Sequence, residues 1–386
     1  MKHKKITVLA AWTLVLSMSL PATAEAASPS FAYSEEKWAS LRDDKLEFDE
    51  ISDLIYEYNS TVEKNRIDYE DYKGKDSDET AQTYYDAADD IYANVEYPDS
   101  NDENYGSKLA SAQTSELSAD QMVEQGDNNV SDGDVVKWGY DKTEKTLVQT
   151  AQSQMISYWN AIVSLESRKN SVSQAESDYQ KAQVQAAAGT ATQTSVLTAE
   201  ETLLNAQAAV TSEESTIASA KEDLCLMMGW NYGDTVEIGA LPEPDAAFST
   251  TIDLEADTAK AVENNYDLKI LDRQIKNAKT AVLQREYETT KKSSEEAVKS
   301  SVKSAYQNLL LTENQYNQTL KSFELEEKTM QTSERKKAAG TISQTAYQSE
   351  VYAYETAETE KKTAAMDLLK AQLTYQWAVA GLASST

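Results

Sequence analysis

The sequence predicts an all-α protein built from two repeated long antiparallel coiled-coil helical hairpins, with an acidic irregular insert. Three observations predict this fold. A seven-residue apolar ladder occurs twice, the copies are offset by 151 residues (the interval from Gly189 to Gly340), and each copy ends at one of those glycines. A strict seven-residue period indicates helices that supercoil against neighbouring helices. Because the pattern is duplicated, one helical hairpin is the expected building unit.

The N-terminal residues predict a secretory signal peptide over 1–26. A basic start at Lys2, Lys4 and Lys5 precedes the apolar run 6–20, and small residues near Ala26 offer a cleavage site. The apolar run is too short to favour a membrane-spanning helix. We therefore expect an exported chain.

Two different segments follow the signal. Residues 27–73 contain apolar residues from Trp38 to Ile55 at helical spacing, which predicts the N-terminal helix of the first repeat, ending near Tyr58–Asn59 or running to about Lys73. Residues 74–134 are acidic and polar with interspersed tyrosines. Short helices over 79–92 and 110–124 are one interpretation, but we expect this insert to be a loop or partly disordered.

The first helical hairpin is expected over 135–232. A long first arm ends at Gly189, as helices commonly end at glycine, and the Thr/Ser residues that follow offer N-caps for the return arm. We predict this tip, and the matching tip of the second hairpin, as docking sites, with these residues: Gly189, Thr190, Thr192, Gly340, Thr341 and Ser343. The packing seam of the return arm comprises Val196, Leu203, Val210, Ile217 and Leu224.

A linker, 233–252, contains Pro242 and Pro244 and leads to the second hairpin, 253–386. No helix breaker interrupts the ladder, so one helix is expected from about 253 to 338. Its seam comprises Val302, Leu309, Tyr316, Phe323 and Met330. The return arm has a line of small residues that allows close helix approach: Ala357, Ala364, Ala371 and Ala378. Lys361 shares the register of the arm's large residues.

Composition excludes several function classes. The formal net charge is −29, and it becomes about −31 when the signal, with three Lys and one Glu, is removed. Nucleic acid is not an expected partner, because the sequence contains no basic stripe that could bind phosphates. The only histidine, His3, lies in the signal, and Cys225 is the only cysteine. We therefore expect no enzyme activity, no metal site and no cofactor.

One acidic stretch, 127–134, matches a calcium-binding loop only in part. Counted from Asp127, the sixth position of such a loop is Asp132 where glycine is required, and the twelfth is Trp138 where glutamate is required. A solvated acidic loop is the expected structure.

Several short motifs together resemble the TolC-like outer membrane efflux protein family. The segment 261–268, AVENNYDL, resembles the start of a repeat in that family, and 56–62 resembles it more weakly. The Gly-x-x-Ser/Thr pattern at both tips resembles the turn between long hairpin arms. Residues 224–229 with 241–244, and 375–381, resemble the closes of the two repeats. The resemblance covers about 38–72 and 135–382.

This resemblance implies a homotrimer whose hairpins form a hollow helical channel. Its tips would meet a periplasmic adaptor (membrane fusion protein) that works with an inner-membrane transporter, and the chain would lie in the cell envelope at the outer membrane. Family members also carry membrane strands. The places for those strands, 74–134 and 285–301, show no alternating apolar pattern here, so no such strands are expected.

A second hypothesis is a secreted coiled-coil structural or surface scaffold without transport activity. The matched glycine tips favour the conduit, because a filament does not require turns at equivalent places. A third hypothesis, ligand binding or metal buffering by the acidic insert, predicts a response to calcium.

Overall fold

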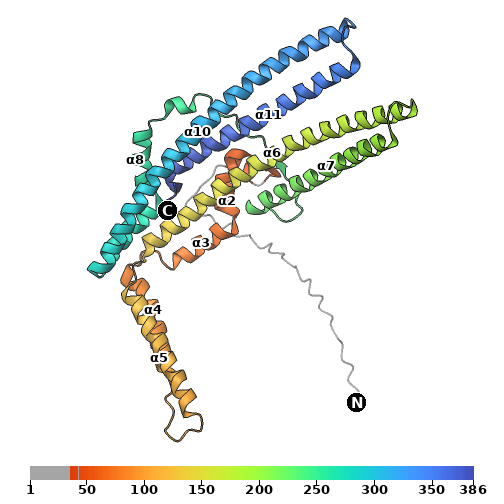
Figure 1. Ribbon diagram of the computed structural model, residues 1–386. Helices are drawn as coiled ribbons and strands as arrows, with labels where there is room; N and C mark the ends of the chain where they lie inside the picture. Colours follow the sequence, from red (N-terminus) through yellow and green to blue (C-terminus); the bar gives the residue numbers. More distant parts are fainter. Residues whose placement is uncertain (1–34, 42) are drawn as a thin grey trace, which may run out of the picture. The chain divides into compact units, whose positions relative to one another are not determined.

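The computed structural model describes residues 35–41 and 43–386 (Figure 1). The predicted signal peptide, 1–26, lies outside the described residues. The chain divides into two compact units, residues 1–43 and 44–386. The first unit contains helix α1 (Glu35–Leu41). The two repeats lie in the second unit, to which the following description applies.

The first repeat begins with short elements where a single helix is predicted for 27–73. They are strand β1 (Lys45–Leu46), the 3-10 turn η1 (Phe48–Glu50) and helices α2 (Ile51–Tyr58) and α3 (Ser60–Glu70). Helix α2 ends at Tyr58, in agreement with the first predicted end, and no helix runs on unbroken to Lys73, because Asn59 has an extended backbone between α2 and α3. Its side-chain oxygen accepts hydrogen bonds from the amides of Thr61 and Val62, which starts a new helix.

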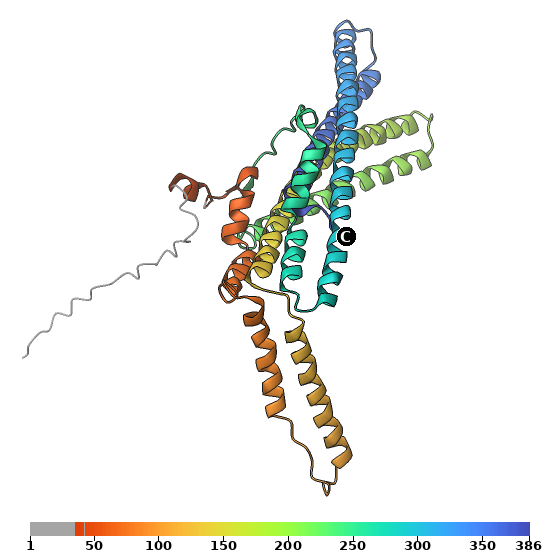
Figure 2. The same ribbon diagram turned by 90° about the vertical axis from the view of Figure 1, so that its left-hand side faces the viewer.

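The acidic insert is a helical hairpin, so the expectation of a loop or partial disorder for 74–134 is corrected. Its helices are α4 (Ser77–Ala93) and α5 (Tyr105–Asp127), seen as the orange and tan pair in Figure 2. A capping box formed by Asp76 and Glu79 starts α4. Four alanines are buried between the helices: Ala81, Ala88, Ala112 and Ala119. Their small side chains allow close packing despite the many carboxylates outside.

Tyrosine side chains also join the two helices of the insert. Tyr85 donates a hydrogen bond to Asp127 at 2.9 Å, and Tyr92 donates one to Asp120 at 2.5 Å. These bonds occupy carboxylates that would otherwise only repel one another.

The first long hairpin consists of α6 (Gly133–Ala187) and α7 (Gln193–Met227), which pack along each other. The linker after it contains strand β2 (Glu237–Ile238) and the 3-10 turn η2 (Phe248–Thr251). β2 pairs in parallel with β1, with Lys45 opposite Glu237 and Leu46 opposite Ile238. The linker is thereby fixed to the start of the first repeat.

The second repeat contains α8 (Leu254–Asn264), α9 (Tyr266–Asn277), α10 (Ala281–Ala338), α11 (Gln344–Trp377) and the π-helical turn η3 (Ala378–Leu382). The expected continuous helix over 253–338 is wrong at two places. Asn265 caps α9 by accepting a hydrogen bond from the amide of Leu268, and Thr280 caps α10 by accepting one from Leu283. Side-chain caps thus start new helices: the ladder Leu254, Ala261, Leu268 and Ile275 keeps its seven-residue spacing through the break at Asn265, whereas Val302, after the break at Thr280, lies one residue out of that register.

The two repeats close in the same way. Gly229 follows α7 with φ of 93°, and Gly381 ends η3 with φ of 117°. A Cβ on Gly229 would lie 2.5 Å from the Cβ of Tyr58, and one on Gly381 would lie 2.6 Å from the carbonyl oxygen of Asn264. Each glycine therefore lets the end of a hairpin approach the residue that precedes a capping asparagine, Asn59 or Asn265.

No helix in the described part of the chain combines the length and the apolarity needed to cross a membrane. The only strands among the described residues are β1 and β2. The two places where the family resemblance implies membrane strands are occupied by α4, α5 and the first half of α10. Both places are therefore helical.

Candidate functional site

The two hairpin tips have the same hydrogen-bonded structure. Gly189 has φ of 72° and Gly340 has φ of 68°. The amide of Thr190 donates to the carbonyl of Gln185 at 2.8 Å, and the amide of Thr341 donates to that of Lys336 at 2.9 Å. The glycine amides donate to Ala186 and Lys337, which completes a Schellman motif at each tip.

Side chains repeat this similarity. The hydroxyls of Thr190 and Thr341 also donate to the carbonyls of Gln185 and Lys336, at 3.0 and 3.1 Å. Thr192 caps α7 and Ser343 caps α11, each through an amide three residues later. The structure thus places all of the sequence-predicted tip residues in two exposed turns of equal construction: Gly189, Thr190, Thr192, Gly340, Thr341 and Ser343.

The tips differ in charge. Arg335, Lys336 and Lys337 lie in the last turn of α10, whereas the last turn of α6 contains no basic residue. Cations near a helix C-terminus are stabilised by the helix dipole. Lys337 also lies over the ring of Tyr347, 3.6 Å from its centroid. One tip is therefore basic and the other is neutral.

None of the predicted seam positions is exposed. On α7 they are Val196, Leu203, Val210, Ile217 and Leu224; on α10 they are Val302, Leu309, Tyr316, Phe323 and Met330. The small-residue line on α11 and η3 comprises Ala357, Ala364, Ala371 and Ala378, of which the last two are buried. A core cluster joins Val302, Leu309, Leu368, Ala371 and Tyr375.

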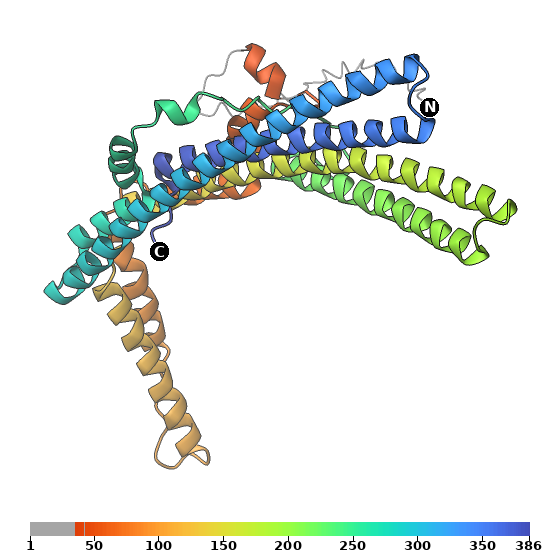
Figure 3. The ribbon, with the colours of Figure 1, turned by 45° about the horizontal axis from the view of Figure 1, so that its top comes forward.

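The four long helices form a row in the order α7, α6, α11, α10 (Figure 3). Within each hairpin the helices pack along their lengths, and α6 packs against α11 between the hairpins. The contact between hairpins includes an apolar cluster of Ile156, Val163, Met366 and Leu369. At its two ends Trp377 donates a hydrogen bond to Gln152 at 2.8 Å, and Lys362 pairs with Glu166 at 3.0 Å.

The outer helices of this row, α7 and α10, expose leucines. Leu197 and Leu204 on α7 are 56% and 58% exposed, and Leu311 and Leu325 on α10 are 56% and 66% exposed. A single exposed leucine is ordinary on a protein surface. Here leucines recur at intervals of seven and fourteen residues on the two helices that end the row. Each outer helix thus carries a leucine edge, defined by its pair of exposed leucines.

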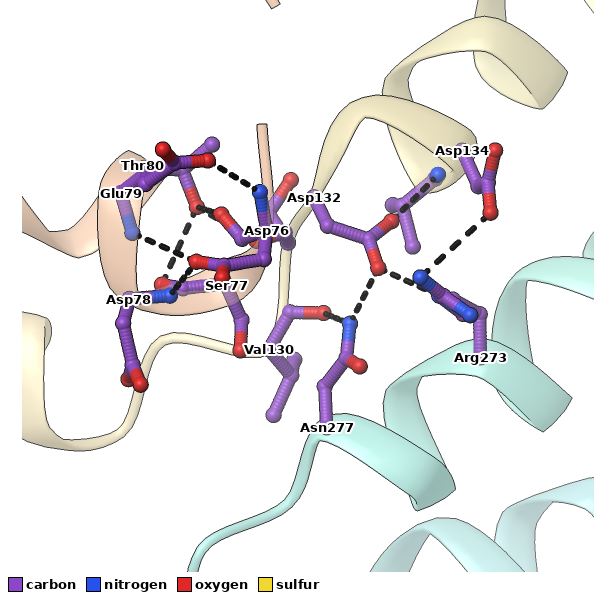
Figure 4. A network of polar contacts seen from close by, with 12 residues as sticks. Asp76, Ser77, Asp78, Glu79, Thr80, Val130, Asp132, Asp134, Arg273 and Asn277 are labelled. Atoms are coloured by element: carbon purple, nitrogen blue, oxygen red, sulfur yellow. Dashed lines mark hydrogen bonds and ion pairs between the residues drawn. The ribbon is translucent and has the colours of Figure 1, made fainter. Parts of the chain in front are cut away.

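A network of polar contacts lies at the base of the α4–α5 hairpin (Figure 4). Asp132, 1% exposed, caps α6 through the amide of Val135. Its carboxylate accepts hydrogen bonds from Arg273 and from Asn277 of α9, the latter at 2.7 Å. Lys279 pairs with Asp78 of α4 at 2.9 Å. These contacts hold the insert to the turn between α9 and α10.

The charge of Asp132 is stabilised within this network. Burial alone would raise the pKa of its carboxyl group, but hydrogen bonds from Asn277, Val135 and Arg273, with the guanidinium charge, lower the pKa below its usual value. The carboxylate that the sequence places in a partial calcium-loop pattern is thus engaged by protein groups. Among residues 35–41 and 43–386, no group of three His, Cys, Asp or Glu side chains is arranged to hold a metal ion.

Sequence reasoning missed this network and the roles of Asn59 and Asn265. The pattern Ser-Asp-Gly-Asp at 131–134 is a usable N-cap signal for Asp132, but its partners lie more than 140 residues later. Cys225 is buried, and burial raises the pKa of its thiol, which disfavours the reactive thiolate.

Comparison with known proteins identifies the fold. No protein-family model matches the chain, and no curated protein matches its sequence significantly. Among solved structures, the Campylobacter jejuni CmeC outer membrane channel has a TM-score of 0.51 at 9% identity, covering 92% of both chains. CusC has a TM-score of 0.51 at 8% identity, covering 91% of this chain and 95% of CusC. The Vibrio cholerae outer membrane protein VceC has a TM-score of 0.50 at 8% identity, covering 86% and 96%.

The chain therefore has the fold of TolC-like outer membrane channels over nearly its full length. The expected fold, two repeated long helical hairpins, is confirmed.

Proposed function

We propose that this chain is a non-enzymatic component of an efflux or export conduit, in which three copies close into a hollow helical channel. One observation carries the proposal: a row of four long helices, in the fold of known channels, ends in two exposed leucine edges, on α7 and α10. The exposed leucines at both ends of the row become buried when the α7 edge of one copy packs against the α10 edge of the next. Such a head-to-tail contact forms a closed ring if the rotation between copies closes.

Packing energetics supports closure. Figure 2 shows the two long hairpins separating toward their tips. There each hairpin is a two-helix coiled coil with little interior of its own. Long helices in water gain most of their stability from packing. Neighbouring copies in a ring would supply that packing.

The spacing of the leucines indicates which residues meet. Leu204 lies 15 residues after Gly189, and Leu325 lies 15 residues before Gly340. At about 1.5 Å per residue, both side chains lie about 22 Å from their own tips. If the tips of adjacent copies are level, these two leucines face each other across the contact between copies.

The exposed tips are proposed as the docking site for a periplasmic adaptor, which in turn would engage an inner-membrane transporter. Two turns of equal construction, one basic and one neutral, would offer an adaptor alternating binding positions around the ring. The signal-like N-terminus and the shared fold support a place in the cell envelope.

Disulfide crosslinking tests the ring. In a Cys225→Ala background, the double variant Leu204→Cys with Leu325→Cys is oxidised and run on a non-reducing gel. The proposal predicts covalent dimers and trimers. The single variants Leu204→Cys and Leu325→Cys are the controls, and they should give no ladder.

A double variant that crosslinks no more than its controls, although folded by circular dichroism, would contradict the proposed contact. A chain that is also monomeric would favour the coiled-coil scaffold.

A further inference from the structure

A cavity of about 340 Å³ lies where the two hairpins meet. Its walls come from α6, α11 and α10, which lie side by side in Figure 3, and residues 240–244 of the linker line it from a fourth direction. The apolar lining includes Trp159, Leu241, Pro242, Pro244, Tyr316 and Met366. This volume is at the lower end of the range for small-molecule sites, about 300–1,000 Å³.

The linker segment over the cavity is fixed at both ends. At its start, the indole of Trp159 donates a hydrogen bond to the carbonyl of Gly239 at 2.9 Å, and the amide of Gly239 donates to Leu46 at 2.8 Å. At its end, Gln372 of α11 makes two hydrogen bonds with the backbone of Asp245, at 2.7 and 3.1 Å. Gln372 is 5% exposed, so these two bonds are needed to satisfy a buried amide.

The segment between these anchors is itself stiff. Pro242 and Pro244 have fixed φ, which leaves little freedom to a five-residue span. A flexible loop would collapse into an apolar hollow and fill it. The linker segment is held over the hollow at both ends, so the cavity is pre-formed. Ligand binding therefore does not include the free-energy cost of ordering this segment.

The two lysines that line the cavity differ in their ion pairs. Lys362 is paired with Glu166 at 3.0 Å and also lies near Glu358 at 3.5 Å. Lys361, half-buried, lies over the ring of Phe323, 4.1 Å from its centroid. Within the described residues no carboxylate forms an ion pair with Lys361. Glu243 also lines the cavity, but it is exposed, where water screens its charge.

We propose that this cavity is a binding site for a small organic anion with an apolar, roughly bicyclic body. The body lies among Trp159, Leu241 and Met366, and the anionic group pairs with the ammonium of Lys361. An indole wall and a tyrosine favour a flat aromatic body. The ammonium of a half-buried lysine, without a carboxylate partner among the described residues, favours an anion over a neutral ligand. The inference does not depend on the conduit proposal, because the walls and the linker belong to one chain.

Isothermal titration calorimetry of the purified chain with 2-naphthoate tests the site, with uncharged 2-naphthamide as the matched probe. We expect saturable binding of naphthoate in the micromolar range and weaker binding of naphthamide. Lys361→Gln should weaken naphthoate binding about fivefold, as expected for one partly exposed ion pair, and should leave naphthamide binding unchanged. Lys370→Gln, an exposed lysine on the same helix outside the cavity, is the control and should bind as the parent does.

A space-filling variant separates this cavity from other surfaces. Ala365→Phe places a ring in the cavity and should abolish binding, while circular dichroism shows the helices intact. Glu243→Gln should change naphthoate binding little, since water screens the charge of this exposed carboxylate.

Three outcomes would overturn the proposal. One is the absence of saturable binding to the parent chain. Another is binding that survives both Ala365→Phe and Lys361→Gln, which would locate the probe elsewhere. The third is a change in the oligomeric mass of the Ala365→Phe variant, measured by light scattering. That change would show that the cavity binds a side chain of a second copy.

Discussion

The side-chain amide of Asn265 donates hydrogen bonds to the backbone carbonyls of Gly381 and Ala383, at 3.2 and 2.8 Å. It thereby joins the start of α9 to the chain end that follows α11. Asn59 does the equivalent in the first repeat, where its amide donates to the carbonyl of Met227 at 2.9 Å at the end of α7. An asparagine that also caps a helix therefore holds each long hairpin at its base, the end opposite the tip.

Replacing Asn265 by alanine should destabilise the second repeat. Asn265 is fully buried, so the variant leaves two carbonyls and the amide of Leu268 without partners. The expected loss in the free energy of unfolding is about 1–3 kcal/mol. Urea denaturation followed by circular dichroism measures it.

Asn314→Ala is the matched control, because Asn314 is exposed on α10 and its amide bonds only to Leu310 of its own helix. A change of about 0.5 kcal/mol or less is expected there. Equal effects of the two substitutions would show that Asn265 does not hold the base of the hairpin.

The repeats were predictable because periodicity and glycine are local signals. Gly189, Gly340 and the seam ladders could be located from spacing alone. The breaks at Asn59, Asn265 and Thr280 could not, because each depends on a single capping side chain, which gives no periodic signal in the sequence.

The acidic insert was misjudged for a related reason. Its helices pack through alanines such as Ala81 and Ala119, which leave no apolar ladder, and its charge is typical of disordered segments. The network of Asp132, Arg273 and Asn277 joins positions far apart in the chain, and one sequence cannot reveal that pairing.

Gly340→Val should weaken the second tip. A β-branched residue at φ of 68° is strained even though open space surrounds this glycine, and the expected cost is about 1–3 kcal/mol. Gly139→Ala within α6 is the control, since its Cβ would meet nothing within 4 Å and no left-handed backbone is required. It should stabilise the chain by about 0.5–1 kcal/mol. Thermal unfolding compares the two, and an unstrained Gly340→Val would mean that the turn has another conformation.

Asp132→Asn should alter the acid sensitivity of the fold. The pKa of Asp132 is lowered in the folded state, so its charge contributes stability above the unfolded-state pKa of about 3.9, and this contribution is lost as pH falls through the lower folded value. At neutral pH the variant should be less stable by about 1–3 kcal/mol.

The difference between variant and parent should shrink as pH falls below about 4, since the parent then loses its own carboxylate. Denaturation curves at pH 7, 5 and 3 measure it. A difference that is constant with pH would show that the charge of Asp132 contributes nothing to stability.

Two alanines on α11 should respond differently to a charge. Ala371 is 4% exposed within the core, whereas Ala364 is half-buried nearer the tip. Ala371→Glu should lower the melting temperature strongly, because a buried unpaired carboxylate is costly, and Ala364→Glu should lower it less. Calorimetry gives the order, and a reversed order would place the tighter helix contact near the tip.

The central claim is that hairpins with too little interior of their own close with other copies into a ring. The molar mass of the purified chain at micromolar concentration, measured by light scattering after size exclusion, tests it most directly. The account predicts the mass of three chains, reduced in the variant Leu204→Glu with Leu325→Glu. A parent chain with the mass of one copy at every concentration would contradict it.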